Sequence, residues 1–294
     1  MFEGRVAIVT GAGRGLGREH ALLLASEGAA VVVNDLGGGT DGSGSDLGPA
    51  HEVADEIVAA GGSAVANTDD VSDWDGAGRL VQQALDEFGG LDVLINNAGI
   101  LRDRMLVNLS EDEWDVVMRV NAKGHAAPLR HAAAYWRERA KEHGTVSAAV
   151  VNTSSPSGLF ANVGQANYGA AKMAVAGLTM IAAKELARYG VRVNAIAPAA
   201  RTRLLGPDSS APSDPQSFDR MDPANVAPFV VYLASDRCSM TGRCFVVYGG
   251  LVTLVEPWKA TAKIEHDGKW TLDDLVARGP ELDVPFESNN PFGY

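Results

Sequence analysis

Tyr168 and Lys172 stand four positions apart in an Ala-rich run at 167–176 that favours a helix. Residues four apart share one helix face, so the phenol and the ammonium are expected to point the same way. A free phenol has a pKa near ~10 and is a poor base at neutral pH. An ammonium about 4 Å away, at an effective dielectric near ~20, would favour the phenolate by roughly 4 kcal/mol. The pair therefore predicts a tyrosine whose pKa is lowered toward neutrality, where a general acid or base works best.

Ser155 lies thirteen residues before Tyr168 and follows the apolar run at 148–151. This run predicts a strand, and Ser155 is expected to present its hydroxyl from the end of that strand. A Tyr–Lys pair at helical spacing is also common on protein surfaces, where it only packs. The three residues therefore indicate a site only together with the rest of the chain.

Short apolar runs alternate with helical patterns along the chain. The expected strands are 5–10, 30–34, 64–66, 93–96, 148–153 and 191–197, and the expected helices are 20–27, 53–60, 74–88, 111–143 and 167–189. Glycine follows these five helices, as a left-handed C-terminal residue prefers. Continuous apolar runs suit strands that are covered on both faces. The pattern predicts an α/β Rossmann architecture, a doubly wound parallel sheet of about seven strands with helices on both faces.

We expect a single domain at 1–250, followed by a C-terminal extension at 251–294 with a short helix at 272–277. Two stretches interrupt the alternation. Residues 36–49 are rich in Gly and Ser and are too long for an ordinary connection. Residues 201–223 follow a strand end and contain four prolines, which favours a lid over the site, although a plain surface loop is the alternative.

The composition excludes several classes of protein. The net charge of −12 disfavours nucleic acid and anionic membranes as partners, since both require a basic surface. No apolar run approaches the ~20 residues that a membrane helix needs. Cys238 and Cys244 form no metal-ligand pattern, so we expect neither a metal site nor a disulfide. With no charged leader before the first expected strand, a cytoplasmic location is the simplest expectation.

Gly11, Gly15 and Gly17 lie between the first expected strand and helix. Glycines at this junction let backbone N–H groups approach a pyrophosphate at the helix N-terminus, which predicts a dinucleotide cofactor. Asp35 ends the second strand, eighteen residues after Gly17, and can accept hydrogen bonds from a ribose 2′-hydroxyl. Arg14 could instead pair with a 2′-phosphate. We expect NAD rather than NADP, because the Asp35 carboxylate would oppose a dianion wherever Arg14 points.

Together these segments resemble the short-chain dehydrogenase/reductase family over about 4–250. The motifs that carry the likeness are residues 10–17 (TGAGRGLG), 70–71 (DV), 96–99 (NNAG), Asn121, Ser155 and 168–172 (YGAAK). The chain looks closest to the (3R)-hydroxyacyl-CoA dehydrogenase part of peroxisomal multifunctional enzyme type 2 and its bacterial relatives, some of which act on hydroxysteroids. The closer likeness rests on residues 33–38 (VNDLGG), 96–104 (NNAGILRDR), 164–168 (GQANY) and 196–198 (IAP).

The resemblance implies roles for individual residues. Tyr168 would be the acid/base, Lys172 would lower its pKa and bind the nicotinamide ribose, and Ser155 would orient the substrate oxygen. Asn121 would hold a water that links Lys172 to solvent, with a satisfied polar helix residue as the alternative. The implied cofactor-binding residues are Gly11, Arg14, Gly15, Leu16, Gly17, Asp35, Asp70, Val71, Asn97, Ala98, Gly99, Tyr168, Lys172, Pro198 and Thr202. Where family members have Pro-Gly after the sixth strand, this chain has Pro198-Ala199.

The resulting hypothesis is an NAD-dependent oxidoreductase that interconverts a secondary alcohol and a ketone. The resemblance implies a 3-hydroxyacyl-CoA or a hydroxysteroid as the small-molecule substrate. Two alternatives are an NADPH-dependent reductase of 3-oxoacyl groups on a carrier protein and a non-catalytic dinucleotide-binding protein. The Ala- and Gly-rich faces of 111–143 and 166–189 suit packing against a second copy, so we expect a homodimer or homotetramer. The final residues, Phe-Gly-Tyr, do not match a peroxisomal address, which favours the cytoplasm.

Overall fold

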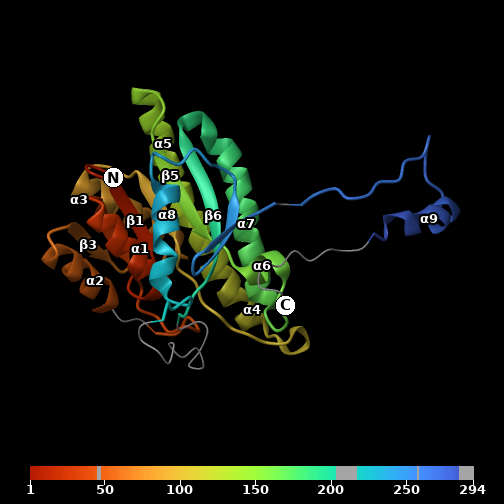
Figure 1. Cartoon of the computed structure of the whole chain (residues 1–294), viewed down its shortest axis with the longest axis horizontal. Coiled ribbons are helices and arrows are strands. Elements are labelled where there is room, and N and C mark those ends of the chain that lie inside the picture. The colour runs from red at the N-terminus through yellow and green to blue at the C-terminus, as the bar shows by residue number, and fades with distance from the viewer. Residues whose placement is uncertain (45–47, 203–216, 257, 285–294) are drawn as a thin grey trace.

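The computed structural model describes residues 1–44, 48–202, 217–256 and 258–284. One sheet of eight strands runs through these residues in the order β3-β2-β1-β4-β5-β6-β7-β8 (Figure 1). The strands are β1 Val6–Thr10, β2 Ala30–Asn34, β3 Ser63–Asn67, β4 Val93–Asn96, β5 Ala148–Thr153, β6 Val191–Ala199, β7 Cys244–Tyr248 and β8 Leu251–Val255. The seven strands β1 to β7 pair in parallel, which confirms the predicted doubly wound sheet.

An eighth strand extends the sheet past the boundary expected at residue 250. Gly249 adopts a left-handed φ of 53°, and the chain turns back so that β8 pairs antiparallel with β7. Glycine tolerates this conformation without steric cost, which permits the short reversal. Residues 251–255 therefore belong to the sheet, and α9 (Leu272–Arg278) lies in the chain that follows it.

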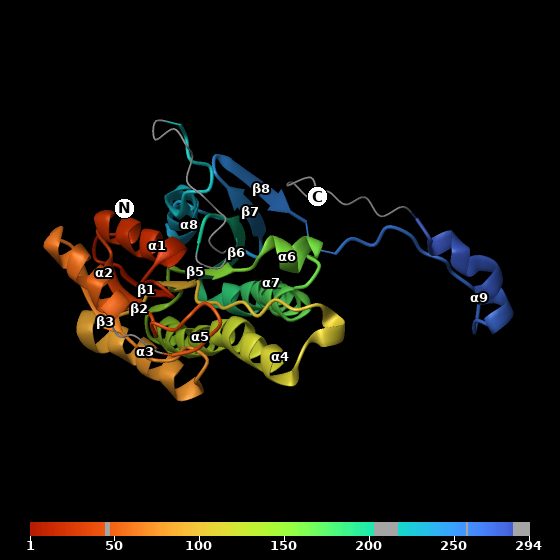
Figure 2. The same cartoon turned by 90° about the horizontal axis from the view of Figure 1, so that it is seen from below.

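Helices cover both faces of the sheet (Figure 2). The helices that flank it are α1 Gly15–Ser26, α2 Gly48–Ala59, α3 Trp74–Phe88, α5 Gly124–His143, α7 Ala166–Leu186 and α8 Ala227–Ala234. On one face Leu24, Val53 and Val230 belong to one buried cluster, and on the other Leu80, Trp136 and Ala182 belong to a second. Helix α2 begins five residues before the expected start, because Gly48-Pro49 opens it and proline is pre-organised for the first turn.

The topology gathers the expected site residues at one edge of the sheet. The strand order reverses between β1 and β4, since β1 pairs with both β2 and β4. In such sheets ligands bind beyond the carboxyl ends of the strands at this switch point. The segments that follow β1, β4, β5 and β6 therefore meet around one cleft.

Among the described residues, no helix is long and apolar enough to cross a membrane, and no cluster of His, Cys, Asp and Glu could hold a metal ion.

His20 is the basis of a stability prediction. It lies in α1 with no exposed surface, and neither ring nitrogen has a hydrogen-bond partner among the described residues. Burial lowers the pKa of His20 to about 3, from 6.5. The unfolded chain takes up a proton below pH ~6.5 while the folded chain does not, so stability falls as the pH drops from ~6.5 toward ~3. At pH 5 the free energy of unfolding should have lost roughly 2 kcal/mol through this residue.

Substituting His20→Leu should remove this component. Urea unfolding at pH 8 and pH 5 would measure the difference, with the exposed His143→Leu as the matched control. If His20→Leu lost as much unfolding free energy between pH 8 and pH 5 as the wild type, the loss would not come from His20.

Candidate active site

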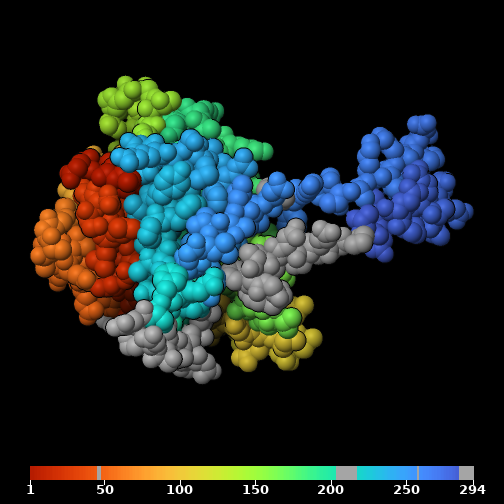
Figure 3. Space-filling model, viewed as in Figure 1, coloured from red at the N-terminus to blue at the C-terminus, as the bar shows by residue number. Residues whose placement is uncertain are grey.

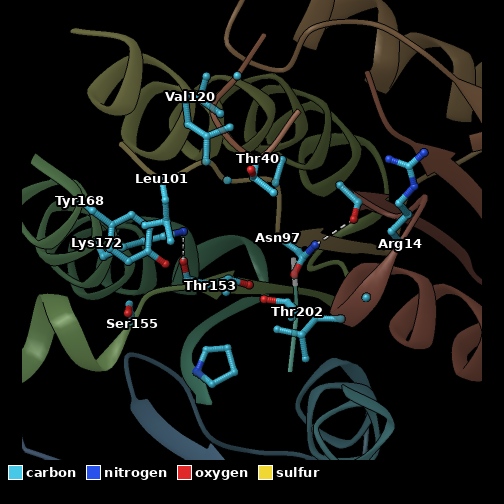
Figure 4. Close-up of a pocket in the computed structure, with 18 of the residues that line it drawn as sticks. Arg14, Thr40, Asn97, Leu101, Val120, Thr153, Ser155, Tyr168, Lys172 and Thr202 are labelled. Atoms are coloured by element: carbon cyan, nitrogen blue, oxygen red, sulfur yellow. Dashed lines mark hydrogen bonds between the residues drawn. The ribbon is translucent and has the colours of Figure 1, made fainter. Parts of the chain in front are cut away.

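Tyr168, Lys172 and Ser155 meet at one end of the cleft (Figure 4). Tyr168 and Lys172 lie on the first turns of α7, and Lys172 is only 2% exposed. The Lys172 Nζ donates to the carbonyl of Thr153 at 2.8 Å and lies 5.6 Å from the centroid of the Tyr168 ring. Ser155 caps the short helix α6 (Pro156–Phe160), and its hydroxyl lies close enough to the Tyr168 phenol to favour the ionised form of that group. The spacing seen in the sequence thus becomes a contiguous group of three side chains.

The pKa of Tyr168 differs from the sequence-based expectation. Burial raises the pKa of the Tyr168 phenol to about 12, against the lowering effect of the Ser155 hydrogen bond and with a further increase from Asp103. Burial also lowers the pKa of Lys172 to about 7. The predicted shift of Tyr168 toward neutrality is therefore wrong for this chain alone. The reason is that removing a phenolate from water outweighs a cation that is itself desolvated and directed at the Thr153 carbonyl.

Asn121 lies where the expected helix 111–143 changes its winding. That span consists of α4 (Glu111–Val117), a π-helical turn (Met118–Lys123) and α5. The Asn121 Nδ2 donates to the carbonyls of Ile100, at 2.9 Å, and Val117, at 3.1 Å. In a regular α-helix the Val117 carbonyl would accept from the Asn121 backbone N–H. The Asn121 side chain competes with that N–H for the same carbonyl, which favours the wider π-helical turn.

The Asn121 Oδ1 faces Lys172. A Cβ added to Gly99 would lie 2.6 Å from this oxygen and 3.4 Å from the Lys172 Nζ. Because Gly99 has no side chain, the space between Asn121 and Lys172 stays open. These two residues belong to different expected helices, 111–143 and 167–189.

The glycine loop closes the other end of the cleft. Asn97 ties the end of β4 to this loop, because its Nδ2 donates to the carbonyls of Thr10 and Gly11 at 3.0 and 3.1 Å. A Cβ at Gly17 would overlap the Gly11 carbonyl oxygen. Gly13, which the sequence reasoning did not select, donates its N–H to the Asp35 Oδ2 at 2.9 Å. The glycines thus keep the backbone of the loop open at Gly11, Gly13 and Gly17, which fits the approach of its N–H groups to the pyrophosphate of a dinucleotide.

Known proteins share this fold and part of this sequence. The profile of the family described as short chain dehydrogenase matches residues 5–208. This chain belongs to the short chain dehydrogenase family. The expected family likeness is therefore confirmed, and the protein is an NAD(P)-dependent oxidoreductase that acts on hydroxyl groups.

Three known proteins illustrate which members of the family this short chain dehydrogenase is similar to. The Mycobacterium tuberculosis protein named Hydroxyacyl-CoA dehydrogenase ChsB1 is 45% identical over 286 residues, which cover 94% of this chain and 87% of that protein. Mouse peroxisomal multifunctional enzyme type 2 is 41% identical over 88% of this chain, which spans 34% of that protein. A crystal structure of a short chain dehydrogenase from Mycobacterium avium superimposes with a TM-score of 0.85 at 49% identity, covering 96% of this chain and 95% of that one.

A cleft of about 950 Å³ in this short chain dehydrogenase joins the two ends of the site. All of the expected cofactor-binding residues line it except Gly17, which lies behind the loop. Asp35 is one of them, and its two carboxylate oxygens accept from the backbone N–H groups of Gly13 and Gly37. Thr202 lines the cleft as expected, and residues 203–216 of the expected lid lie outside the described part of the chain.

The described ends of the expected lid are joined to each other. Arg201 makes a two-pronged ion pair with Asp219, at 2.6 and 2.9 Å, and its backbone N–H donates to the Met221 carbonyl. Arg201 and Met221 both line the cleft. The pairing closes the base of this segment beside the site.

Several lining residues were not selected from the sequence. Thr40 belongs to the Gly-rich segment 36–44. This segment lies against the loop after β4, where the Leu101 N–H donates to the Thr40 carbonyl at 2.9 Å. Thr153 and Gln165 also line the cleft. Thr153 lies two positions before Ser155, and Gln165 lies inside the 164–168 motif, so their position was a usable signal. Tyr248 reaches the cleft from β7, and nothing local in the sequence indicated it.

Gly17→Ala should show how closely the cradle is built. The added methyl group would meet the Gly11 backbone, which has no rotamer to relieve the overlap, so we expect a loss of roughly 1–3 kcal/mol or more in unfolding free energy. Cofactor binding, followed by NADH fluorescence, should weaken as well. The matched control is Gly177→Ala inside α7, where an added Cβ meets no atom within 4 Å and should stabilise the protein by up to ~1 kcal/mol. Equal stability of the two variants would argue against the close packing of the loop.

Proposed function

We propose that this protein is an NAD-dependent dehydrogenase that interconverts 3-hydroxyacyl-CoA and 3-oxoacyl-CoA thioesters. The observation that carries the proposal is the Ser155–Tyr168 pair above the buried Lys172, in a cleft that also contains Asp35. The names of the M. tuberculosis and mouse relatives support the acyl-CoA class.

The proposed roles follow from the geometry of the three side chains. Tyr168 gives a proton to the ketone oxygen, or takes one from the alcohol, and Ser155 holds the same oxygen beside the phenol. The nicotinamide, when bound, supplies or accepts the hydride. With a pKa of about 12 the Tyr168 phenol is protonated at neutral pH, which suits it to donate in the reducing direction. For the oxidising direction, the Lys172 ammonium is the nearby charge that favours the phenolate.

Asp35 supports NAD rather than NADP. Its carboxylate lines the cleft at the end of β2, where the ribose of a dinucleotide lies in this architecture. Arg14 lines the same region, and it is the residue that favours the alternative, an NADPH-dependent reductase of 3-oxoacyl groups on a carrier protein. Turnover with NADH and NADPH separates the two, and a strong preference for NADPH would reject the Asp35 argument.

The substrate class can be tested directly. A panel of (R)- and (S)-3-hydroxyacyl-CoA thioesters and hydroxysteroids, assayed by the appearance of NADH, should show turnover with the thioesters. Turnover with hydroxysteroids alone would reject the acyl-CoA class. No turnover with any alcohol would favour a non-catalytic dinucleotide-binding protein.

We also propose that the protein is a homodimer or homotetramer. The helix α9 lies apart from the sheet at the end of an extended segment (Figure 1), and its blue atoms form a lobe separate from the body of the molecule (Figure 3). It exposes the apolar side chains of Leu272, Leu275 and Val276, of which Leu272 is 77% exposed. Apolar side chains that stay exposed on a helix in the described part of the chain suit a second copy as the partner. Sedimentation that finds only monomer at assay concentrations would reject this.

A cytoplasmic location completes the proposal. The free thiols of Cys238 and Cys244 suit a reducing compartment. Cell fractionation that places the protein elsewhere would reject it.

A further inference from the structure

Buried polar atoms without partners gather behind Lys172. Among the described residues, the Asn121 Oδ1, the Thr153 Oγ1 and both ring nitrogens of His125 are buried and have no hydrogen-bond partner. All three residues are at least 94% buried, and His125 and Asn121 have no exposed surface. Each such atom costs free energy unless water or another group satisfies it.

The three residues that carry these atoms lie close to the Lys172 ammonium. The Lys172 Nζ donates to the Thr153 carbonyl at 2.8 Å, and it shares the space above Gly99 with the Asn121 Oδ1. The His125 imidazole lies within reach of the backbone of Thr153, Asn121 and Asn96, and close enough to Lys172 for the ammonium to affect it. A polar, enclosed site with this number of unsatisfied atoms is the kind of place where buried water is part of the structure.

The His125 imidazole is suited to hold such water because the ring is uncharged. Burial, together with the nearby Lys172 ammonium, holds the pKa of His125 well below its usual value. A neutral imidazole has one donor and one acceptor, so it can bridge two waters and place a lone pair toward a cation.

We propose that His125 is a positioning residue whose imidazole, through buried water shared with Asn121 Oδ1 and Thr153 Oγ1, solvates the Lys172 ammonium and keeps it charged beside Tyr168. The inference rests on the roles proposed above for Tyr168 and Lys172. The titratable groups that face Lys172 are Tyr168 on its own helix and His125 on α5. Asp103 acts on Tyr168 from the loop after β4, and Arg119 and Lys123 of the π-helical turn are exposed.

The direction of the effect follows from charge solvation. If the water at His125 is lost, the ammonium of Lys172 is less favoured, and the Tyr168 phenolate loses part of its counter-charge. Oxidation of the alcohol then needs a higher pH, because the phenolate is the base in that direction. Cofactor affinity should change little, since His125 does not line the cleft.

The test compares His125→Leu, which cannot hold water, with His125→Asn, which can. With (R)-3-hydroxybutyryl-CoA and NAD, the pH profile of kcat for His125→Leu should move upward by about half a pH unit or more. Its kcat at pH 7 should fall about threefold or more, as that shift requires, while KM for NAD stays within about twofold. His125→Asn should recover most of both. The matched control is His131→Leu, on the same helix but bonded to the Trp74 carbonyl at 2.9 Å, which should keep the wild-type profile.

The outcomes separate this inference from the proposed function. An active wild type whose pH profile is unchanged in His125→Leu overturns the inference and leaves the function standing. If the probe substrates are not turned over by the wild type, the proposed function fails instead.

A second measurement leaves His125 in place, so it does not depend on the His125 variants. The ¹⁵N shifts of the His125 ring should report a neutral imidazole from pH 6 to 9 and should change in Lys172→Met. Ring signals that ignore the Lys172 substitution would overturn the inference, even if both His125 variants failed to fold.

Discussion

Replacing Tyr168 by phenylalanine should lower kcat by about 10²–10⁴-fold, the usual contribution of a positioned general acid or base. The ring would keep its place on α7 and its position 5.6 Å from the Lys172 Nζ, so only the phenolic proton is removed. Ser155 would then remain as a hydrogen-bond donor to the substrate oxygen without a partner that can exchange a proton with it. The loss should therefore appear in kcat, with KM for the cofactor nearly unchanged.

Steady-state rates in both directions, together with NADH fluorescence titration, would measure this. Tyr232→Phe is the matched control, because that tyrosine lies on α8 with 42% of its surface exposed and outside the cleft. The control should keep wild-type rates. A Tyr168→Phe enzyme within twofold of the wild type would show that the proton comes from elsewhere, and would favour the non-catalytic alternative.

Asp35→Asn should change the choice of cofactor. The substitution keeps the shape of the side chain but removes the charge that opposes a 2′-phosphate, so kcat/KM with NADP should rise by about 10- to 100-fold, or roughly 1.4–2.8 kcal/mol. Use of NAD should fall by about tenfold, because the amide is a weaker acceptor for ribose hydroxyls and leaves Gly13 without its carboxylate partner.

The ratio of kcat/KM values for the two cofactors is the measurement. Asp69→Asn is the control, since Asp69 also lines the cleft but its carboxylate is paired with Arg79 at 2.6 Å. That variant should leave the ratio within about threefold. A wild type that already prefers NADP, or an Asp35→Asn enzyme with an unchanged ratio, would show that Arg14 rather than Asp35 governs the choice.

Much of the fold was predictable from local patterns. Apolar runs of strand length, glycines after helices and the glycine loop before α1 are each encoded within a few neighbouring residues, and the parallel sheet followed from their alternation. The spacing of Tyr168 and Lys172 likewise placed them on one helix face, because helix geometry relates residues four apart.

Other features depended on contacts between distant segments. The donation from Gly13 to Asp35 and the bond from Asn121 to the Ile100 carbonyl each join residues more than twenty positions apart, outside the local pattern from which either residue was read. The pKa of Tyr168 depends most strongly on such contacts between distant segments. Sequence spacing indicated a nearby cation, but the loss of water around both groups raised the phenol pKa and lowered that of Lys172. Desolvation is a property of everything packed around a group, so only the tertiary structure decides it.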